Sequence, residues 1–186
     1  MMNSIWTQPI CRLAVATSVI LFAPLVSAQS ALPAAAQAKA DTYKAKLVDW
    51  AANPTILAAA REANAKGSLP GMTNGKWSEV DDKDAIVKSL ETSPAGILIN
   101  KWEADKNVNK LVLRDQKGNL VASSLKPLVY NVAARPPFIN AIKGAPWTAG
   151  EIKPDPSTGV KSVQVSAPVL DGDKVIGVLH AAISVD

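Results

Sequence analysis

His180 is the only histidine in the 186 residues, so any metal or triad chemistry has to be built around it. A structural zinc site takes four convergent Cys or His ligands, and the one cysteine, Cys11, lies near the amino terminus. The sequence therefore predicts no zinc site and no other cofactor. Asp171-Gly172-Asp173 and Asp81-Asp82 carry oxygen ligands suited to calcium, but neither has the spacing of a calcium loop. A turn and a helix cap are the better interpretations.

Serine hydroxyls are the candidate nucleophiles, and they occur at Ser123, Ser124, Ser166 and Ser184. No nucleophile-elbow motif and no phosphate-binding loop surrounds any of them. A Ser–His–acid arrangement that uses His180 stays open, because such triads are recognised by geometry rather than by sequence order. With no catalytic motif in the chain, we expect a protein that is not an enzyme.

Residues 1–28 have the properties of a secretory signal peptide. The stretch from Leu13 to Leu25 is almost wholly apolar, and Pro24 breaks it just before small residues that end at Ala28. This arrangement satisfies the A-x-A-like cleavage rule, so we predict cleavage before Gln29 and a periplasmic or secreted location. An uncleaved anchor is the alternative, although the apolar stretch is shorter than the ~20 residues of a membrane span.

Composition indicates one soluble domain after the leader. The whole chain has a net charge of +4, and its basic residues are scattered rather than clustered. Scattered charge does not form the basic stripe that nucleic acid or anionic lipid requires, so we expect no nucleic-acid partner. A cysteine-free exported domain of this length can bury a sufficient core without disulfides.

The first half of the mature chain, residues 29–107, has helical periodicity. A side chain that can cap a helix, followed by a proline at the first helical position, marks the start of a helix. This pattern occurs at Asn53-Pro54, as a helix restart, and again at Ser93-Pro94. Glycine and proline predict a loop over 67–80, and Asp81 or Asp82 is expected to cap a short helix with Ile86, Val87 and Leu90 inward. In the helix after Pro94 the inward face is predicted to carry Ile97, Leu98 and Trp102.

The second half, residues 108–186, changes to a period of two, which is typical of strands. Residues 110–114 and 119–123 flank a tight turn and predict an antiparallel hairpin. A strand is expected over 147–152. Residues 161–169 alternate with Val163, Val165, Ala167 and Val169 on one face, and a turn at 171–174 leads into a final strand over 175–185. About five antiparallel strands with helices ahead of them indicate an α+β fold.

The order of these markers resembles the Cache family, the PAS-like extracytoplasmic sensing module of bacterial chemoreceptors and kinases, in its single-Cache or PDC-sensor form. The resemblance is carried by Leu111–Ser124 as a first hairpin, Arg135–Gly144 as a pocket helix, and Val165–Gly172 with Val175–Leu179 as a closing hairpin. It implies a long amino-terminal helix packed on the sheet, and in related sensors that helix forms dimer contacts. A homodimer through this helix is therefore one expectation.

The resemblance also implies a ligand site between the sheet and the segments that follow the second strand. Carried over by position, Tyr130 and Arg135 would lie at the pocket rim, Phe138 would form a wall, and Trp147 would lie on the adjoining strand. The planar guanidinium of an arginine suits a carboxylate bidentately. His180 is expected to be a half-buried core or pocket residue on the last strand.

Amino-acid-binding members have an acidic residue near the end of the last strand, where this chain has Ala182. A buried ammonium without a counter-charge is costly, so the resemblance favours a simple carboxylate over an amino acid. Receptors of the family continue into a membrane helix, whereas this sequence ends at Asp186. We therefore expect ligand capture that acts through a membrane-bound partner.

Each residue-level assignment has a structural alternative. Arg135 could equally be a surface arginine in an ion pair with a nearby acid, and Tyr130 is open to a similar structural interpretation. Single residues have no unique meaning without geometry. Trp50 and Trp102 lie at helical spacing from leucines and are best interpreted as core residues. The alternative for the whole protein is a periplasmic structural or protein-interaction module with a PAS-like fold and no small ligand, since unrelated functions share folds. A cavity lined by Arg135 would favour ligand binding.

Overall fold

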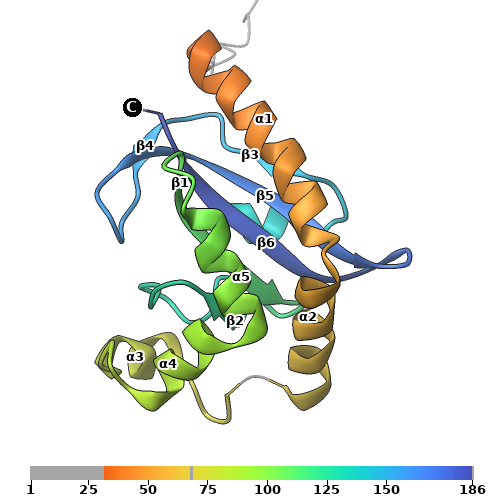
Figure 1. The fold of residues 1–186 in the computed structure, drawn as a ribbon, viewed down its shortest axis with the longest axis vertical. Coiled ribbons are helices and arrows are strands. Elements are labelled where there is room, and N and C mark those ends of the chain that lie inside the picture. The colour runs from red at the N-terminus through yellow and green to blue at the C-terminus, as the bar shows by residue number, and fades with distance from the viewer. Residues whose placement is uncertain (1–31, 68, 186) are drawn as a thin grey trace, which may run out of the picture.

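The computed structural model describes residues 32–67 and 69–185, and in this part of the chain six helices accompany a six-stranded antiparallel sheet (Figure 1). The predicted α+β class, with a long amino-terminal helix on an antiparallel sheet, is confirmed. The elements in chain order are α1 (Ala34–Ala51), α2 (Pro54–Lys66), α3 (Asn74–Glu79), α4 (Ala85–Thr92), α5 (Pro94–Glu103), β1 (Val108–Asp115), β2 (Leu120–Ser123), α6 (Pro136–Ala141), β3 (Trp147–Thr148), β4 (Lys153–Pro154), β5 (Lys161–Asp171) and β6 (Lys174–Ser184).

The sheet has the strand order β2-β1-β6-β5-β3, with β4 also paired to β5. Two hairpins form it, β1–β2 and β5–β6, and both were predicted from the period of two. The strand predicted over 147–152 is shorter, because pairing with β5 stops after Thr148 and resumes at Lys153. Gly118 supplies the positive φ of 82° that the β1–β2 turn requires.

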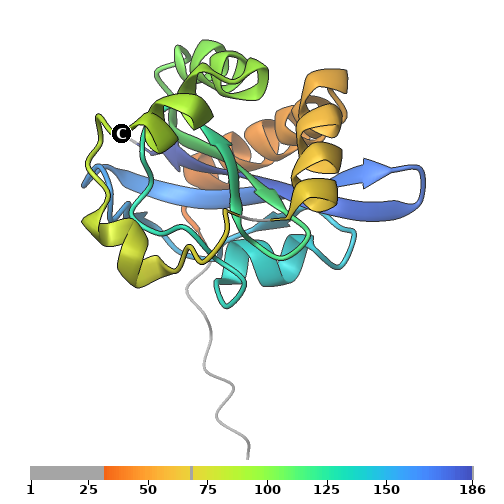
Figure 2. The same ribbon diagram turned by 90° about the horizontal axis from the view of Figure 1, so that it is seen from below.

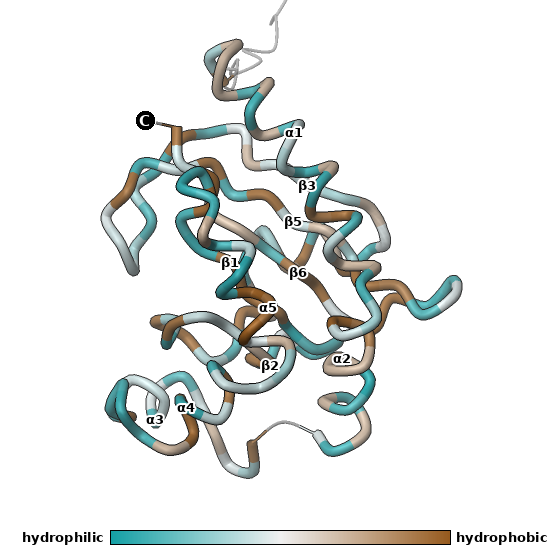
Figure 3. The backbone as a smooth tube through the Cα atoms, viewed as in Figure 1, coloured by the Kyte–Doolittle hydropathy of each residue, from teal (hydrophilic) through white to brown (hydrophobic). Residues whose placement is uncertain are grey.

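One face of the sheet packs against α1, α2 and α5, and Figure 2 shows these helices on the side opposite α6. Alternate residues of the central strands are buried in this layer, as period two demands. The predicted apolar face of β5 is confirmed, and it joins β1, β6 and the helices in one core. In Figure 3 the hydrophobic colour is concentrated along β5 and β6. The core residues on β1, β5 and β6 include Leu111, Leu113, Val163, Val165, Ala167, Val169, Leu179, Ala181 and Ile183.

Helix boundaries follow local capping chemistry. Asn53 accepts a hydrogen bond from the backbone of Thr55, and Ser93 accepts one from Gly96, so both predicted cap-and-proline starts are confirmed. The cap of α4 was predicted at Asp81 or Asp82, but Asp84 accepts the hydrogen bond from Ile86. Asp81 instead accepts from the backbone of Lys83 in the preceding turn.

Two predictions were wrong in this region, one made from composition and one from helical spacing. The stretch 67–80 was expected to be a loop, yet it contains α3, because Thr73 caps the helix and Trp77 is fully buried beneath it. Ile97 was expected to face inward on α5, but it is 61% exposed, while Ala95, Gly96 and Ile99 are buried. A Cβ on Gly96 would lie 2.2 Å from the carbonyl oxygen of Leu90, so small residues are what lets α5 pack closely on α4.

The signal peptide predicted at residues 1–28 lies outside the described residues. Among the helices that the structure does describe, none combines the length and the apolar character needed to cross a membrane.

Candidate functional site

A cavity of about 540 Å³ lies on the face of the sheet opposite α1. Its floor is the polar set of alternate residues on β1, β5 and β6, and its roof is the segment from Pro127 to Phe138, which includes the start of α6. Trp147 and Ala149 form one side. The volume falls in the range of small-molecule sites. Floor residues are Lys110, Arg114, Ser162, Gln164 and His180, and roof residues include Leu128, Val129, Val132, Pro137 and Phe138.

Strand register brings the floor residues together from three separate strands. His180 pairs with Val112 on β1 and with Ser166 on β5, and the next row of the same face contains Lys110, Ala182 and Gln164. A register shift between Val108 and Lys110 places one extra residue in β1 at this point. Backbone pairing between the strands, rather than loop conformation, therefore fixes the positions of the floor residues.

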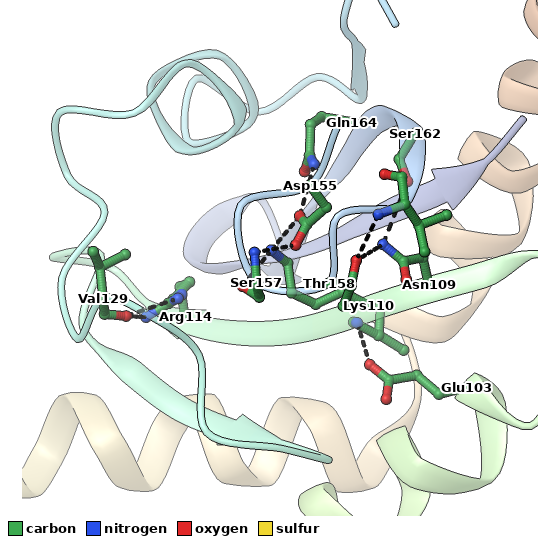
Figure 4. A network of polar contacts seen from close by, with 12 residues as sticks. Glu103, Asn109, Lys110, Arg114, Val129, Asp155, Ser157, Thr158, Ser162 and Gln164 are labelled. Atoms are coloured by element: carbon green, nitrogen blue, oxygen red, sulfur yellow. Dashed lines mark hydrogen bonds and ion pairs between the residues drawn. The ribbon is translucent and has the colours of Figure 1, made fainter. Parts of the chain in front are cut away.

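Arg114 is 1% exposed and has no acidic hydrogen-bonding partner among the described residues. Its Nη1 donates to the carbonyl of Tyr130 at 2.6 Å and to that of Val129 at 3.3 Å, and its Nη2 also donates to Val129 at 3.3 Å. Figure 4 shows this contact with the roof. A guanidinium has five N–H donors, and the Nε donor is buried without a described partner. Arg114 thus lines the cavity and keeps one buried N–H donor, at Nε, without an acceptor among the described residues.

Burial lowers the pKa of Arg114 to about 9, while Asp115 and Tyr130 act in the opposite direction. The side chain is therefore still a cation at neutral pH. Burial also lowers the pKa of His180 well below its usual value, and the positive charges of Arg114 and Lys110 add to this effect. His180 is consequently a neutral imidazole, and its Nδ1 is buried without a partner among the described residues.

Lys110 and Asp155 form an ion pair at the other end of the cavity floor. The carboxylate of Asp155 also accepts hydrogen bonds from the side chain of Gln164 at 3.3 Å and the backbone of Ser157 at 2.9 Å (Figure 4). Burial alone would raise the pKa of Asp155, but the bonds from Lys110 and Ser157 outweigh burial and hold it below its usual value. Asp155 is therefore a carboxylate anion at neutral pH.

The structure brings four of the five predicted site residues to the cavity. Arg135, Phe138, Trp147 and His180 line it, with Arg135 exposed at the rim and Phe138 buried in the roof. Tyr130 does not line it: its hydroxyl accepts a hydrogen bond from the backbone of Leu69 at 2.9 Å. Tyr130 contributes to the site through its backbone carbonyl, which holds Arg114.

Sequence reasoning missed five polar residues of the floor and its end: Lys110, Arg114, Asp155, Ser162 and Gln164. A signal for Arg114 and Lys110 was present, because both alternate with the core residues Leu111 and Leu113 and so share the other face of β1. No pattern in the sequence indicates that this polar face is covered. Asp155 lies between two prolines, and no feature of the sequence around it indicates a place in the site.

The charged residues that line the cavity include two acids, and each is paired with a lysine: Asp155 with Lys110, and Glu151 with Lys153 at 2.6 Å. Among the cations that line the cavity, Arg114 and Arg135 therefore have no acidic partner in the described part of the chain. The cavity therefore has the electrostatic character of an anion site. Within the described residues, no group of three or more His, Cys, Asp or Glu side chains is arranged to hold a metal ion.

Comparison with solved structures returns sensor domains of the Cache type, the family that the sequence resembles. The sensor domain of the histidine kinase DctB from V. cholerae is 17% identical, with a TM-score of 0.44 over 81% of this chain and 57% of that one. The sensory domain of the Campylobacter jejuni chemoreceptor Tlp3, with isoleucine bound, is 14% identical, with a TM-score of 0.41 over 82% of this chain and 63% of that one.

The E. coli DcuS sensor domain is 14% identical, with a TM-score of 0.40 over 77% of this chain and 92% of that one. The chain thus spans about three fifths of the length of the DctB and Tlp3 domains. At these identities the likeness concerns the fold, and the bound isoleucine is a property of Tlp3. No family model and no curated protein matches the sequence.

Proposed function

We propose that this protein is an exported, Cache-type sensory module that binds a small organic carboxylate in the cavity between the sheet and the 127–138 segment. The observation that carries the proposal is the buried cation Arg114, which has an unpaired Nε and no acidic partner among the described residues. A buried charge without a partner is costly. A carboxylate ligand would supply both the missing charge and the missing hydrogen-bond acceptors.

The roles of the lining residues follow from their chemistry. Arg114 holds the carboxylate with its unpaired Nε donor, and the neutral His180 offers one further hydrogen-bonding nitrogen on the same floor. Arg135, at the exposed rim, attracts the anion and guides it inward. Phe138 and Trp147 cover the apolar body of the ligand and exclude water, which strengthens the charged contacts.

The mode of action belongs to the same proposal. The predicted leader supports an extracytoplasmic location, where ligand capture is transmitted through a membrane-bound partner. The long helix α1 packs on β5 and β6, the strands that carry Gln164 and His180 on their opposite face. Pairing of α1 with a second copy is proposed as the homodimer contact. The cavity supports ligand capture over the alternative of a ligand-free interaction module.

Isothermal titration of the mature protein with a panel of straight-chain and aromatic carboxylates tests the proposal, together with the matching amides as neutral analogues. We expect carboxylates to bind and their amides to bind at least tenfold more weakly. Arg114→Gln should abolish binding, while Arg61→Gln, which removes a surface arginine on α2 outside the cavity, should leave it unchanged. No binding by any carboxylate, or equal binding in Arg114→Gln, would contradict the proposal.

A further inference from the structure

Asp155 occupies the end of the cavity where a second anionic group of a ligand would otherwise bind. Its side chain is fully buried, and it neutralises Lys110, which is a cation on the cavity floor. Gln164 and the backbone of Ser157 donate to the same carboxylate. The protein thus places a carboxylate of its own against Lys110 at that end of the floor.

Arg114 and Lys110 lie on one strand and one face, four residues apart. A strand rises by about 3.4 Å per residue, so their Cα atoms are roughly 13 Å apart. His180 lies opposite Val112, which is midway between them. The floor therefore has a cationic end at Arg114, a neutral middle at His180, and a charge-compensated end at the Lys110–Asp155 pair.

We propose that Asp155 is the specificity-determining residue of this cavity, which restricts the ligand to acids with a single carboxylate. The inference rests on the proposed function. A linear diacid held by Arg114 directs its second carboxylate toward Asp155, where it meets a like charge in a low-dielectric site and finds Lys110 already paired. A monoacid of the same length places a methyl group there and meets no repulsion.

Wild-type protein gives the first test without any substitution. Hexanoate is compared with hexanedioate, and octanoate with octanedioate, by isothermal titration at neutral pH. The monoacid of each pair should bind at least tenfold more tightly than its diacid. Equal or tighter binding of the diacids, with monoacids still binding, would overturn the inference and leave the proposed function standing. If neither kind of acid binds, the proposed function fails and the inference fails with it.

Asp155→Asn then identifies the residue responsible, because it keeps the shape and frees Lys110. The ratio of diacid to monoacid affinity should rise at least tenfold. Glu151→Gln is the matched control, since it removes a carboxylate from an ion pair at the exposed rim of the same cavity, and its ratio should stay within twofold of wild type.

The double variant Lys110→Met/Asp155→Asn separates recruitment by Lys110 from simple loss of repulsion. It should bind monoacids as wild type does and lose the part of the gain in diacid binding that Lys110 supplies; any gain that persists measures the repulsion by Asp155, and both results assign the selectivity to Asp155. An unchanged ratio in a folded Asp155→Asn protein would overturn the inference. Circular dichroism establishes folding, and if Asp155→Asn does not fold, the wild-type pairs decide alone.

Discussion

The guanidinium of Arg114 donates a 2.6 Å hydrogen bond to the backbone carbonyl of Tyr130, and this bond ties the floor of the cavity to its roof. The same side chain donates to the carbonyl of Val129. One residue of β1 therefore holds the 127–138 segment in place and supplies the cation that a ligand would meet. The proposed function therefore links ligand binding and local folding at this side chain.

Replacement of Arg114 by glutamine should destabilise the protein even without a ligand. The substitution removes hydrogen bonds to two roof carbonyls; that of Tyr130 keeps the backbone N–H of Leu120 as a donor, while that of Val129 loses its described donor, and an unsatisfied polar group costs about 1–3 kcal/mol. Urea unfolding of the ligand-free protein measures the loss. Arg61→Gln, which breaks an exposed ion pair with Asp171, should cost less than about 1 kcal/mol. Equal losses in the two variants would contradict a structural role for Arg114.

Tyr43→Phe should destabilise the protein in a pH-dependent way. The hydroxyl of Tyr43 donates to Asp105 at 2.5 Å and, helped by Asn107 and opposed by burial, holds the pKa of Asp105 well below its usual value. A carboxyl group with a lowered pKa stabilises the fold above its unfolded-state pKa of about 3.9, and this stabilisation is lost as the pH falls through the folded-state value.

The deficit of Tyr43→Phe relative to wild type should therefore be full between pH 5 and 7, at about 1.5–3 kcal/mol. Below about pH 4 it should shrink progressively, because the unfolded chain takes up the proton on Asp105 first and the folded wild-type protein does so only at lower pH. Urea unfolding over a series of pH values provides the measurement. A deficit that stays constant down to pH 2 would show that the charge of Asp105 is not involved.

Alanine at Gly96 and alanine at Gly75 should have opposite effects. Both glycines lie in helices, where alanine is intrinsically favoured by up to about 1 kcal/mol. A Cβ at Gly96, however, would lie 2.2 Å from the carbonyl oxygen of Leu90 and 2.4 Å from that of Glu91, so α4 and α5 would have to separate. Gly75 has only the Thr73 hydroxyl nearby, at 3.8 Å.

Thermal unfolding of the two variants measures the difference. Gly96→Ala should lower the stability by about 1–3 kcal/mol, the usual cost of overpacking. Gly75→Ala should leave the stability unchanged or raise it. A stabilised Gly96→Ala protein would show that α5 does not pack on α4 as closely as described.

The stacked pair Trp50 and Trp102 should show energetic coupling. Their rings lie 4.9 Å apart at an interplanar angle of 8° and join α1 to α5 on the same face of the sheet. Such pairs contribute about 0.5–1.5 kcal/mol beyond the area they bury. A double-mutant cycle with Trp50→Leu and Trp102→Leu, measured by urea unfolding, should return a coupling of this size. Additive effects of the two substitutions would contradict the stacking contribution.

Strand structure could be predicted from sequence because its signals are local. The alternation around Val163 and Val165 and the turn at Gly118 each lie within a few residues, and the structure confirms both. Helix α3 was missed because its stability comes from burial of Trp77, a long-range effect that glycine-rich composition conceals. The orientation of α5 was missed because the contact that decides it, Gly96 against Leu90, lies between two helices.

The candidate site could be predicted only in part, for a related reason. Phe138 and Trp147 line the cavity where the resemblance placed them along the chain, and His180 lines it where its position on the last strand indicated. Arg114 and Lys110 look like solvent-facing strand residues until a roof is placed over them. That roof is the 127–138 segment, whose irregular backbone has no periodic signal. Tyr130 lies in this segment too, but its side chain turns toward Trp77 rather than the cavity.

The alternation of β6 has a mechanical consequence. His180 faces the cavity, while its neighbours Leu179 and Ala181 belong to the core beneath α1. Only one thickness of polypeptide separates the two compartments. A displacement of the β6 backbone at His180 would therefore act directly on Leu179 and Ala181 beneath α1, without a relay of side chains.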